Sequence, residues 1–467
     1  MEVKEVINNG EQRPTAYIIV GGAWGDEGKG KVASWAAQNA DLVIRATGGA
    51  NAGHTVEFRK GNSEETTSIA LHLIPGGIVY PHTTCLIGQG VVIDIKVLLD
   101  EIKMLEELGV PNVRERLYIS GRAHVVFPYH KSLDILHEMK KDKKIGTTKR
   151  GIGPCYADKD NRVGIRIYDL LLPYEKLAKK IDVATRLHNQ AFLENKMEEA
   201  FVCSLKLAQE YEAYGNEIKN MVVDADHLVE NFRREAKQIA VEGAQAYRLD
   251  KDYGDYPNVT SSNCVTAGTL IGAHLNHKDV KEVIVITKAH FSRVGNGPFP
   301  TEQPAHVEND NVIPYEESEA YVGDIIREMA HEYGATTKRP RRCGWFDGPL
   351  VKSSKAATGA DYLCINHLDT LGKLGNKLGY IRICTSYKYQ GEVIDYYPDD
   401  IEFSGELPEA IYHEIKGGWD VPKGLTNYED LPEQAKEFVR IVETVTEIPV
   451  KYIGIGPKNE DLIVRNV

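Results

Sequence analysis

Long apolar runs are missing from this sequence of 467 residues. No stretch approaches the roughly 18 consecutive apolar residues that a membrane-spanning helix needs, so we expect no membrane partner. Positive charge is also scarce, because 56 lysines and arginines stand against 68 aspartates and glutamates, which gives a formal net charge of −12. This balance argues against a general binder of nucleic acid or membrane surfaces. An anionic ligand would therefore need a local cluster of basic side chains.

Cysteine is sparse and scattered. The seven cysteines form no CxxC pair and no Cys/His ligand set, and their number is odd. Reduced thiols in a protein of the cytoplasm are the expected reading of this pattern. The first residues, MEVKEVINNGEQRP, are polar and lack the apolar segment of a signal peptide. We therefore expect a cytoplasmic location.

What the sequence does contain is an alternation of short apolar runs with amphipathic segments. Residues 16–20, 41–46 and 282–289 are almost entirely apolar or β-branched, as in parallel strands that are covered on both faces. Segments such as 28–39 and 94–109 have helical periodicity instead. This alternation predicts an α/β fold, with a large, mostly parallel central sheet and flanking helices.

The domain organisation follows from the same reading. Residues 1–15 are expected to be a polar N-terminal extension, and residues 16–467 a single domain without internal repeats or low-complexity linkers. The charged stretch at about 174–236 has few strand signals, so we expect a helical insertion there. Residues 386–398 predict a hairpin that turns at Gln390 and Gly391.

A glycine-rich turn, GGAWGDEGKGK at 21–31, lies between a predicted strand and a predicted helix. Such a turn directs main-chain N–H groups and the positive helix end toward an anion, as in a phosphate-binding loop. It is a variant P-loop, because Ala23 stands at the first glycine of the G-x-x-x-x-G-K-[ST] pattern and Gly30 at its hydroxyl residue. Asp26 could replace that hydroxyl as the metal ligand and lie beside a reacting group. The alternative is a glycine-rich turn with solvated charges.

This loop and eight further motifs resemble the adenylosuccinate synthetase family, in the family's order and from about residue 16 to the end. The family phosphorylates O6 of IMP with GTP and then displaces that phosphate with the amine of L-aspartate, which gives adenylosuccinate, GDP and phosphate. The motifs are WGDEGKGK (24–31), GGANAGHT (48–55), LHLIPGGI (71–78), IGTTKRGIGPCYADK (145–159), VEGAQ (241–245), YPNVTSSN (256–263), SRVGNGPFPTE (292–302), GATTKRPRRCGWFD (334–347) and GIGP (454–457).

The resemblance implies three catalytic side chains and one cofactor, Mg²⁺. Asp26 resembles the base that removes the N1 proton of IMP, and its carboxylate and the Gly53 carbonyl resemble the metal ligands. His54 resembles the general acid at the β-phosphate, a role that suits an imidazole because its pKa is near neutrality. Gln245 could donate to the oxygen that gains charge at C6.

The resemblance also implies three sets of binding residues. Those for GTP are Glu27, Gly28, Lys29, Gly30, Lys31, Gly53, His54, Thr55, Arg341, His367, Leu368, Asp369, Gly454, Gly456 and Pro457. Those for IMP are Asp26, Lys29, Asn51, Ala52, Gly53, His54, Thr147, Thr148, Arg162, Gln245, Thr260 and Arg339. Those for aspartate are Thr336, Thr337, Arg339 and Arg341, in a loop whose guanidinium groups suit carboxylates.

Arg162 resembles an arginine that reaches the IMP phosphate from a neighbouring subunit. The resemblance therefore implies a homodimer whose active sites are shared between the two copies. The expected partners are GTP, IMP, L-aspartate and a second copy of the chain, with no nucleic acid and no membrane.

Three positions depart from the family's pattern. His367 replaces the lysine of the guanine-reading (T/N)-K-x-D motif, while Asp369 is kept; Lys338 stands where a glycine is usual in the aspartate loop. Ala246-Tyr247-Arg248 stand where small and apolar residues usually line the purine. These departures leave open a paralogue that aminates a 2-amino purine nucleotide (GMP or dGMP), with ATP as a possible donor.

Two further classes compete with the ligase. A P-loop GTPase or kinase would carry Ser or Thr on its Mg²⁺ in the loop and a separate Asp at a strand end, and neither is evident. A paralogue that only binds nucleotide would tolerate the loss of Asp26 or His54, and both are present.

Overall fold

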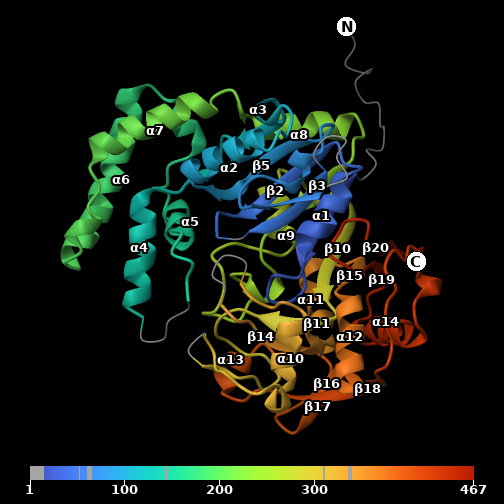
Figure 1. The fold of residues 1–467 in the computed structure, drawn as a ribbon. Helices are drawn as coiled ribbons and strands as arrows, with labels where there is room; N and C mark the ends of the chain where they lie inside the picture. Colours follow the sequence, from blue (N-terminus) through green and yellow to red (C-terminus); the bar gives the residue numbers. More distant parts are fainter. Residues whose placement is uncertain (1–14, 52, 60–65, 142–145, 309–310, 335–338) are drawn as a thin grey trace, which may run out of the picture.

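The computed structural model describes residues 15–51, 53–59, 66–141, 146–308, 311–334 and 339–467. Its centre is an 11-stranded sheet in the order β20-β19-β15-β10-β1-β9-β2-β5-β6-β8, with β7 paired to β5. Every pair in it is parallel except β19–β20. The expected mostly parallel sheet is therefore confirmed (Figure 1). Its strands are β1 (Ala16–Gly21), β2 (Leu42–Gly48), β5 (Thr84–Ile93), β6 (Leu117–Ser120), β7 (His124–Val125), β8 (Val222–Val223), β9 (Ile239–Glu242), β10 (Val280–Lys288), β15 (Tyr362–Asn366), β19 (Val450–Gly454) and β20 (Leu462–Val464).

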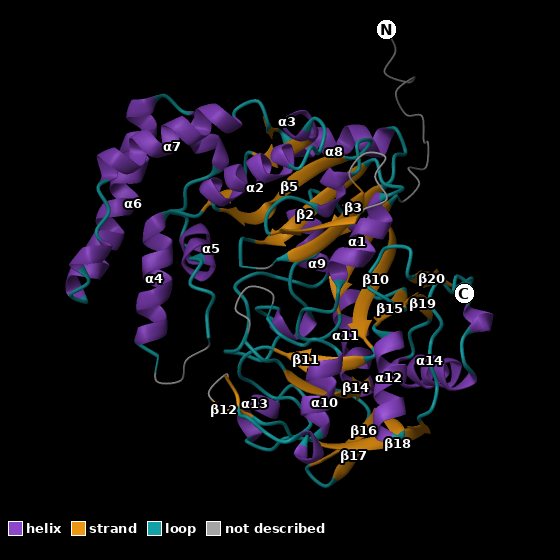
Figure 2. Ribbon diagram, in the orientation of Figure 1, coloured by secondary structure: helices purple, strands orange, loops and turns teal. Residues whose placement is uncertain are grey.

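Apolar side chains cover both faces of this sheet. Along β2, Leu42 and Ile44 belong to one buried cluster and Val43 to another, as the alternation of side chains in a strand requires. Figure 2 shows helices packed around the sheet. They include α1 (Lys29–Ala37), α2 (Ile95–Glu107), α3 (Val113–Arg116), α9 (Thr266–Gly272), α12 (Leu368–Leu378) and α14 (Glu433–Thr446).

A smaller sheet of five strands carries the segments between β10 and β15 and after α12. Its strand β16 turns into β17 at Gln390 and Gly391, which both have positive φ, as the expected hairpin needs. Two further strand pairs stand apart, β3 (His54–Arg59) with β4 (Thr66–Leu71), and β12 (Val307–Glu308) with β13 (Asn311–Val312). The five strands are β11 (His290–Arg293), β14 (Arg342–Asp347), β16 (Tyr380–Tyr389), β17 (Glu392–Ile394) and β18 (Glu409–Lys416).

The stretch expected to be helical contains α6 (Tyr174–Glu194), α7 (Ser204–Ile218) and α8 (Ala225–Arg234). It also contains β8, which pairs with β6, so the chain returns to the sheet edge between α7 and α8. Figure 1 shows α6 as the outer member of an arm that includes α4 (Pro128–Met139) and α5 (Ile152–Asp160). None of the helices among the described residues is long and apolar enough to cross a membrane.

A buried trio joins the helices of this arm. Asp158 on α5 lies 3.0 Å from Nε2 of His130 on α4 and 2.9 Å from Nε2 of His188 on α6. Burial alone would raise the pKa of Asp158, but the two imidazoles lower it to about 2. Nδ1 of His130 accepts the Phe127 N–H, so the ring proton is on Nε2 and points at Asp158. The trio is therefore a hydrogen-bonded brace, since a neutral His130 has no lone pair left for a metal.

Asp347 predicts a pH dependence of stability. It ends β14 and caps α11 (Gly348–Thr358) by accepting the Leu350 N–H, and the Tyr387 hydroxyl also donates to it. Complete burial raises its pKa to about 7. A carboxyl with a raised pKa favours the folded state at low pH, and this contribution is lost as the pH rises through about 7. We expect the Asp347 contribution to unfolding free energy to fall by about 2 kcal/mol from pH 5 to pH 8.

Urea unfolding at both pH values measures this effect against Asp347→Asn, in which the titrating group is absent. The variant should lose less stability between pH 5 and pH 8 than the natural protein. Equal losses would show that Asp347 is already ionised at pH 5.

Candidate active site

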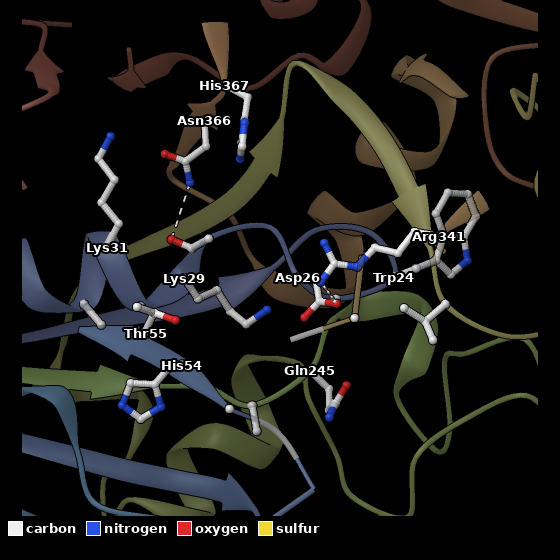
Figure 3. Close-up of a pocket in the computed structure, with 18 of the residues that line it drawn as sticks. Trp24, Asp26, Lys29, Lys31, His54, Thr55, Gln245, Arg341, Asn366 and His367 are labelled. Atoms are coloured by element: carbon white, nitrogen blue, oxygen red, sulfur yellow. Dashed lines mark hydrogen bonds and ion pairs between the residues drawn. The ribbon is translucent and has the colours of Figure 1, made fainter. Parts of the chain in front are cut away.

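The carboxyl ends of the central strands meet at one edge of the sheet, where ligands bind in open α/β folds. The loops after β1, β2, β9, β15 and β19 all contribute to a cavity of about 820 Å³ at this edge. Figure 3 shows labelled side chains that follow β1, β2, β9 and β15, and Arg341 from the segment before β14, around one space. Chain segments that are far apart in sequence therefore form one site.

The glycine-rich loop after β1 has a tightly wound main chain. Gly25, Asp26 and Gly28 have φ values of 91°, 59° and 80°. A Cβ on Gly28 would lie 2.9 Å from Nδ2 of Asn366, so only glycine fits there without a shift. Glu27 is buried and accepts the N–H groups of Ala23 (3.3 Å) and Gly25 (2.8 Å), and Lys29 Nζ lies 2.6 Å away. The Glu27 side chain thus holds the loop in shape. The contact with GTP that the resemblance implies would have to come from the main chain of Glu27.

Asp26, the other member of the acidic pair, points the opposite way. Its side chain is 45% exposed, lines the cavity and lies 2.7 Å from Nη2 of Arg341 (Figure 3). Burial alone would lower the pKa of Arg341, but the charges of Asp26 and Glu332 raise it above its usual value. The sequence placed both residues in the site, and the structure brings them into contact.

The indole ring of Trp24 is held by a buried charged cluster that lies outside the cavity wall. Its indole N–H donates to Asp255 (2.9 Å), which also accepts from Arg293 Nη1 (2.5 Å) and Arg248 Nε (2.8 Å). Arg248 and Tyr247 are therefore buried in this cluster, and neither lines the cavity. The departure at 246–248 therefore places no side chain in the cavity wall.

His54 begins β3 and lines the cavity. Within the described part of the chain, neither ring nitrogen has a hydrogen-bond partner, although both are buried. Burial, with Arg45 and His72, holds the pKa of His54 well below its ordinary value. The ring nitrogens are therefore available to a ligand.

Glu242 and Arg45 line the same cavity as His54. Neither of them was singled out from the sequence. They are register partners on β9 and β2, so their side chains leave the same face of the sheet. Glu242 accepts the Gly76 N–H (2.9 Å), and its other oxygen lies 3.7 Å from Nε2 of His54. Burial raises the pKa of Glu242 to about 6, against the charge of Arg45. The signal in the sequence was a glutamate in the VEGAQ motif, in which only the glutamine had been singled out.

Gln245 and Asn51 bring amides to the cavity from the loops after β9 and β2. Gln245 has a φ of 62°, a conformation that turns the chain sharply after the strand. Oδ1 of Asn51 is buried and has no hydrogen-bond partner among the described residues. These polar groups can bind a ligand that the cavity admits.

The far end of the cavity is formed by the loops after β15 and β19. Asn366 donates to the Glu27 carbonyl (2.8 Å), and Lys31 donates to the carbonyls of Gly456 (2.7 Å) and Asp461 (2.9 Å). These bonds fasten the glycine-rich loop to both neighbouring segments. His367 lines this end with a φ of 65°.

His367 presents a neutral ring at this end of the cavity. Burial, together with His290 and Lys288, lowers its pKa to about 3. The His290 ring packs against it at 81°, with the ring centroids 5.4 Å apart. An uncharged, supported imidazole therefore stands where the family's motif has a lysine.

The cavity wall contains most, but not all, of the residues singled out in the sequence. The expected residues that line it are Asp26, Gly28, Lys29, Gly30, Lys31, Asn51, Gly53, His54, Thr55, Thr148, Gln245, Arg341, His367, Asp369, Gly456 and Pro457. Those described but outside the wall are Glu27, Thr147, Arg162, Thr260, Arg339, Leu368 and Gly454. Ala52, Thr336, Thr337 and the departure at Lys338 lie outside the described residues.

Physical reasons explain several of these placements. The Thr147 hydroxyl donates to Asp134 (2.8 Å), which leaves Thr148 to face the cavity. Leu368 is fully buried in the apolar core, so only its main chain can reach a ligand. Gly454 is packed so closely that a Cβ would lie 2.3 Å from Oδ1 of Asn366. Arg162 is exposed on the surface.

Comparison with known proteins places this arrangement among purine-nucleotide ligases. The family model "Adenylosuccinate synthetase" matches residues 18–463. Adenylosuccinate synthetases of Heliobacterium modesticaldum and Acetivibrio thermocellus are 41% and 42% identical over 96% of this chain, and over 98% and 99% of their own lengths.

Two solved structures are also similar. A fully ligated adenylosuccinate synthetase from Plasmodium falciparum has a TM-score of 0.83 and 34% identity, over 97% of this chain and all of that one. A succinoaminodeoxyadenylate synthetase of cyanophage S-2L, bound to dGMP and dATP, has a TM-score of 0.58 over 97% of this chain and 96% of that one. At 18% identity it shares the fold alone.

Proposed function

The chain belongs to the adenylosuccinate synthetase family and joins L-aspartate to IMP through a new C–N bond, and we propose that it does so in the cavity described above with GTP and Mg²⁺. The observation that carries this proposal is the arrangement of Asp26, His54 and Gln245, which three separate loops direct into one cavity (Figure 3). Asp26, His54 and Gln245 follow β1, β2 and β9, which are neighbouring parallel strands of the central sheet. Open α/β folds bind ligands at the carboxyl ends of such strands.

The residues present fit a magnesium ion. Asp26 offers a half-exposed carboxylate in the cavity, and Gly53 lines the same cavity. A carboxylate and a main-chain carbonyl are hard oxygen donors of the kind that Mg²⁺ prefers. The guanidinium of Arg341 already pairs with that carboxylate, so this position favours positive charge. A magnesium ion bound by Asp26 and Gly53 would offset the charge of the triphosphate.

The first chemical step is assigned to Asp26. A lactam oxygen is a poor leaving group, so the keto group of IMP must be phosphorylated before an amine can displace it. Asp26 removes the N1 proton, which turns O6 into a nucleophile toward the γ-phosphorus of GTP. Its left-handed main chain directs the carboxylate out of the loop, while the adjacent Glu27 holds the loop from inside.

Two further side chains stabilise developing charge. His54, whose ring nitrogens have no hydrogen-bond partner in the described structure, donates to the departing β-phosphate oxygen. Gln245 donates to the oxygen at C6. Arg341 then binds a carboxylate of L-aspartate while the amine attacks C6 and phosphate leaves.

The nucleotide base is assigned to the end of the cavity at His367 and Asp369. The Asp369 carboxylate can accept the N1–H and N2–H donors of guanine, which adenine lacks. The neutral His367 ring can pack on either purine, so it does not by itself exclude ATP. We therefore propose GTP as the donor, with Asp369 as the residue that selects it.

One assay tests the function and the choice of nucleotide together. Phosphate release is measured with GTP or ATP, Mg²⁺, and IMP or dGMP, each with and without L-aspartate. We expect release that requires IMP and aspartate, and that is about tenfold faster with GTP than with ATP at limiting nucleotide. Release that ignores aspartate would indicate a simple nucleotidase, and equal rates with ATP would remove the role given to Asp369.

We also propose a homodimer in the cytoplasm. Arg162 lies on the surface with a φ of 64°, outside the wall of its own cavity, which suits a side chain that serves a second copy. Six of the seven cysteines are buried free thiols, which suits a reducing compartment. Sedimentation of the natural protein would give the mass of two chains if the dimer forms.

A further inference from the structure

A buried carboxylate, Glu332, lies behind the cavity wall between α10 (Val322–Met329) and β14. It accepts hydrogen bonds from four side chains that come from three parts of the chain. These are Lys288 Nζ (2.5 Å), His290 Nε2 (2.7 Å), Ser292 Oγ (3.0 Å) and Arg341 Nη1 (2.5 Å). None of the site motifs read from the sequence included Glu332, Lys288 or His290 among its functional residues.

The basic side chains around Glu332 keep its carboxylate ionised. Burial alone would raise its pKa, but Lys288, His290 and Arg341 together hold the pKa well below its ordinary value. The main chain adds a further link, because the Arg341 N–H donates to the Glu332 carbonyl (2.9 Å). Arg341 is thus held to Glu332 by both its main chain and its side chain.

The donors that Glu332 leaves free on Arg341 form one edge of the guanidinium. Nη1 is bound to Glu332, Nη2 lies 2.7 Å from Asp26, and Nε is buried with no hydrogen-bond partner in the described part of the chain. Nε and Nη2 together make a planar fork that matches the two oxygens of a carboxylate, and an incoming carboxylate would take Nη2 from Asp26. An unpartnered buried donor costs free energy, which a carboxylate on this edge would recover.

We propose that Glu332 is a positioning residue for the ligase reaction: by holding Nη1 of Arg341, it presents the Nε–Nη2 edge to a carboxylate of L-aspartate. The inference rests on the proposed role of Arg341 in binding aspartate. Lys288, His290 and Ser292 support it by fixing Glu332 in place. A guanidinium free to rotate would lose this alignment, so the affinity for aspartate falls while the IMP contacts, which do not include Arg341, remain.

Steady-state kinetics of Glu332→Gln test the proposal, with each substrate varied in turn. The amide keeps the shape of the side chain, but its uncharged oxygen accepts from Arg341 less strongly than a carboxylate oxygen, and its NH2 group cannot accept at all. We expect KM for aspartate to rise about tenfold and KM for IMP to change by less than about twofold, while KM for GTP, in whose expected binding set Arg341 also stands, rises less than KM for aspartate. The matched control is Glu328→Gln on α10, whose half-exposed side chain bonds to the Tyr333 hydroxyl, and we expect it to change none of the three.

A double-mutant cycle separates positioning from general damage. If Glu332 acts through Arg341, then adding Glu332→Gln to Arg341→Ala should raise KM for aspartate by less than about twofold more. Full multiplication of the two effects would overturn the proposal, as would a folded Glu332→Gln protein with unchanged KM for aspartate. If Glu332→Gln does not fold, Ser292→Ala, which removes one donor to the same carboxylate, decides: a rise in KM for aspartate supports the proposal and no rise overturns it.

The single variant Arg341→Ala distinguishes this inference from the function beneath it. An unchanged KM for aspartate in Arg341→Ala would remove the aspartate role of Arg341 itself, and the present inference with it. A raised KM in Arg341→Ala with an unchanged KM in folded Glu332→Gln would overturn only the role given to Glu332.

Discussion

Asp26→Asn should lower kcat by about four orders of magnitude and leave the fold intact. An amide cannot take the N1 proton and is a weaker magnesium ligand, so one substitution removes two contributions to the same step. The free energy of unfolding should change by less than about 1 kcal/mol, because the side chain is half-exposed in the cavity. Single-turnover formation of GDP from GTP, in the presence of IMP and without aspartate, measures the first step directly.

Asparagine is the informative replacement because Asp26 has a φ of 59°. Asparagine tolerates this left-handed conformation better than alanine does, so Asp26→Ala would mix a chemical loss with a distorted loop. A pair of variants separates the two: Asp26→Ala should also lower stability, whereas Asp26→Asn should not. If Asp26→Asn kept phosphate release within about tenfold of the natural enzyme, the base would have to be sought elsewhere.

His54→Asn should lower kcat by about two to three orders of magnitude, with little change in KM for IMP. The imidazole is proposed to donate to the phosphate oxygen that gains charge only as the bond to the γ-phosphorus breaks, so its loss affects the transition state more than the bound substrates. Steady-state assays at saturating and limiting IMP measure the two constants separately.

His331→Asn is the matched control for this change. His331 also lines the cavity, its side chain is exposed, and its φ of 52° suits asparagine. We expect kcat to change by less than about threefold in this control. An equal loss of activity in both variants would indicate damage to the cavity rather than a missing donor at His54.

Much of the fold could be predicted from local patterns in the sequence. Apolar runs marked the parallel strands because both faces of the sheet are buried, and β1, β2 and β10 coincide with the runs at 16–20, 41–46 and 282–289. The stretch at about 174–236 was read as helical from its periodicity, and α6, α7 and α8 lie there. The short strand β8 escaped notice because two residues, Val222 and Val223, are too few to show a period. The smaller sheet was not foreseen as a unit, since its strands pair across long separations.

The proposed catalytic residues could be singled out from the sequence because each lies within a dense local motif. Glu242 and Glu332 could not, since the role of each depends on residues that lie far along the chain. Glu242 meets His54 only because β9 and β2 pair in a fixed register. Glu332 meets Lys288 and His290 only because the turn after α10 lies against the end of β10 and the start of β11. Arg248 shows the reverse: its position suggested the purine wall, but Asp255 binds its guanidinium away from the cavity.

By itself, the sequence determined the class of fold, the phosphate-binding turn and the family, because these depend on residue order and spacing over a few consecutive positions. Only the tertiary structure decided which way the two acids of the loop point, and which buried charges support the side chains in the cavity. The physical reason is that the direction and pKa of an ionisable side chain depend on burial and on charges brought near it by the fold. Neighbours in sequence do not fix either quantity.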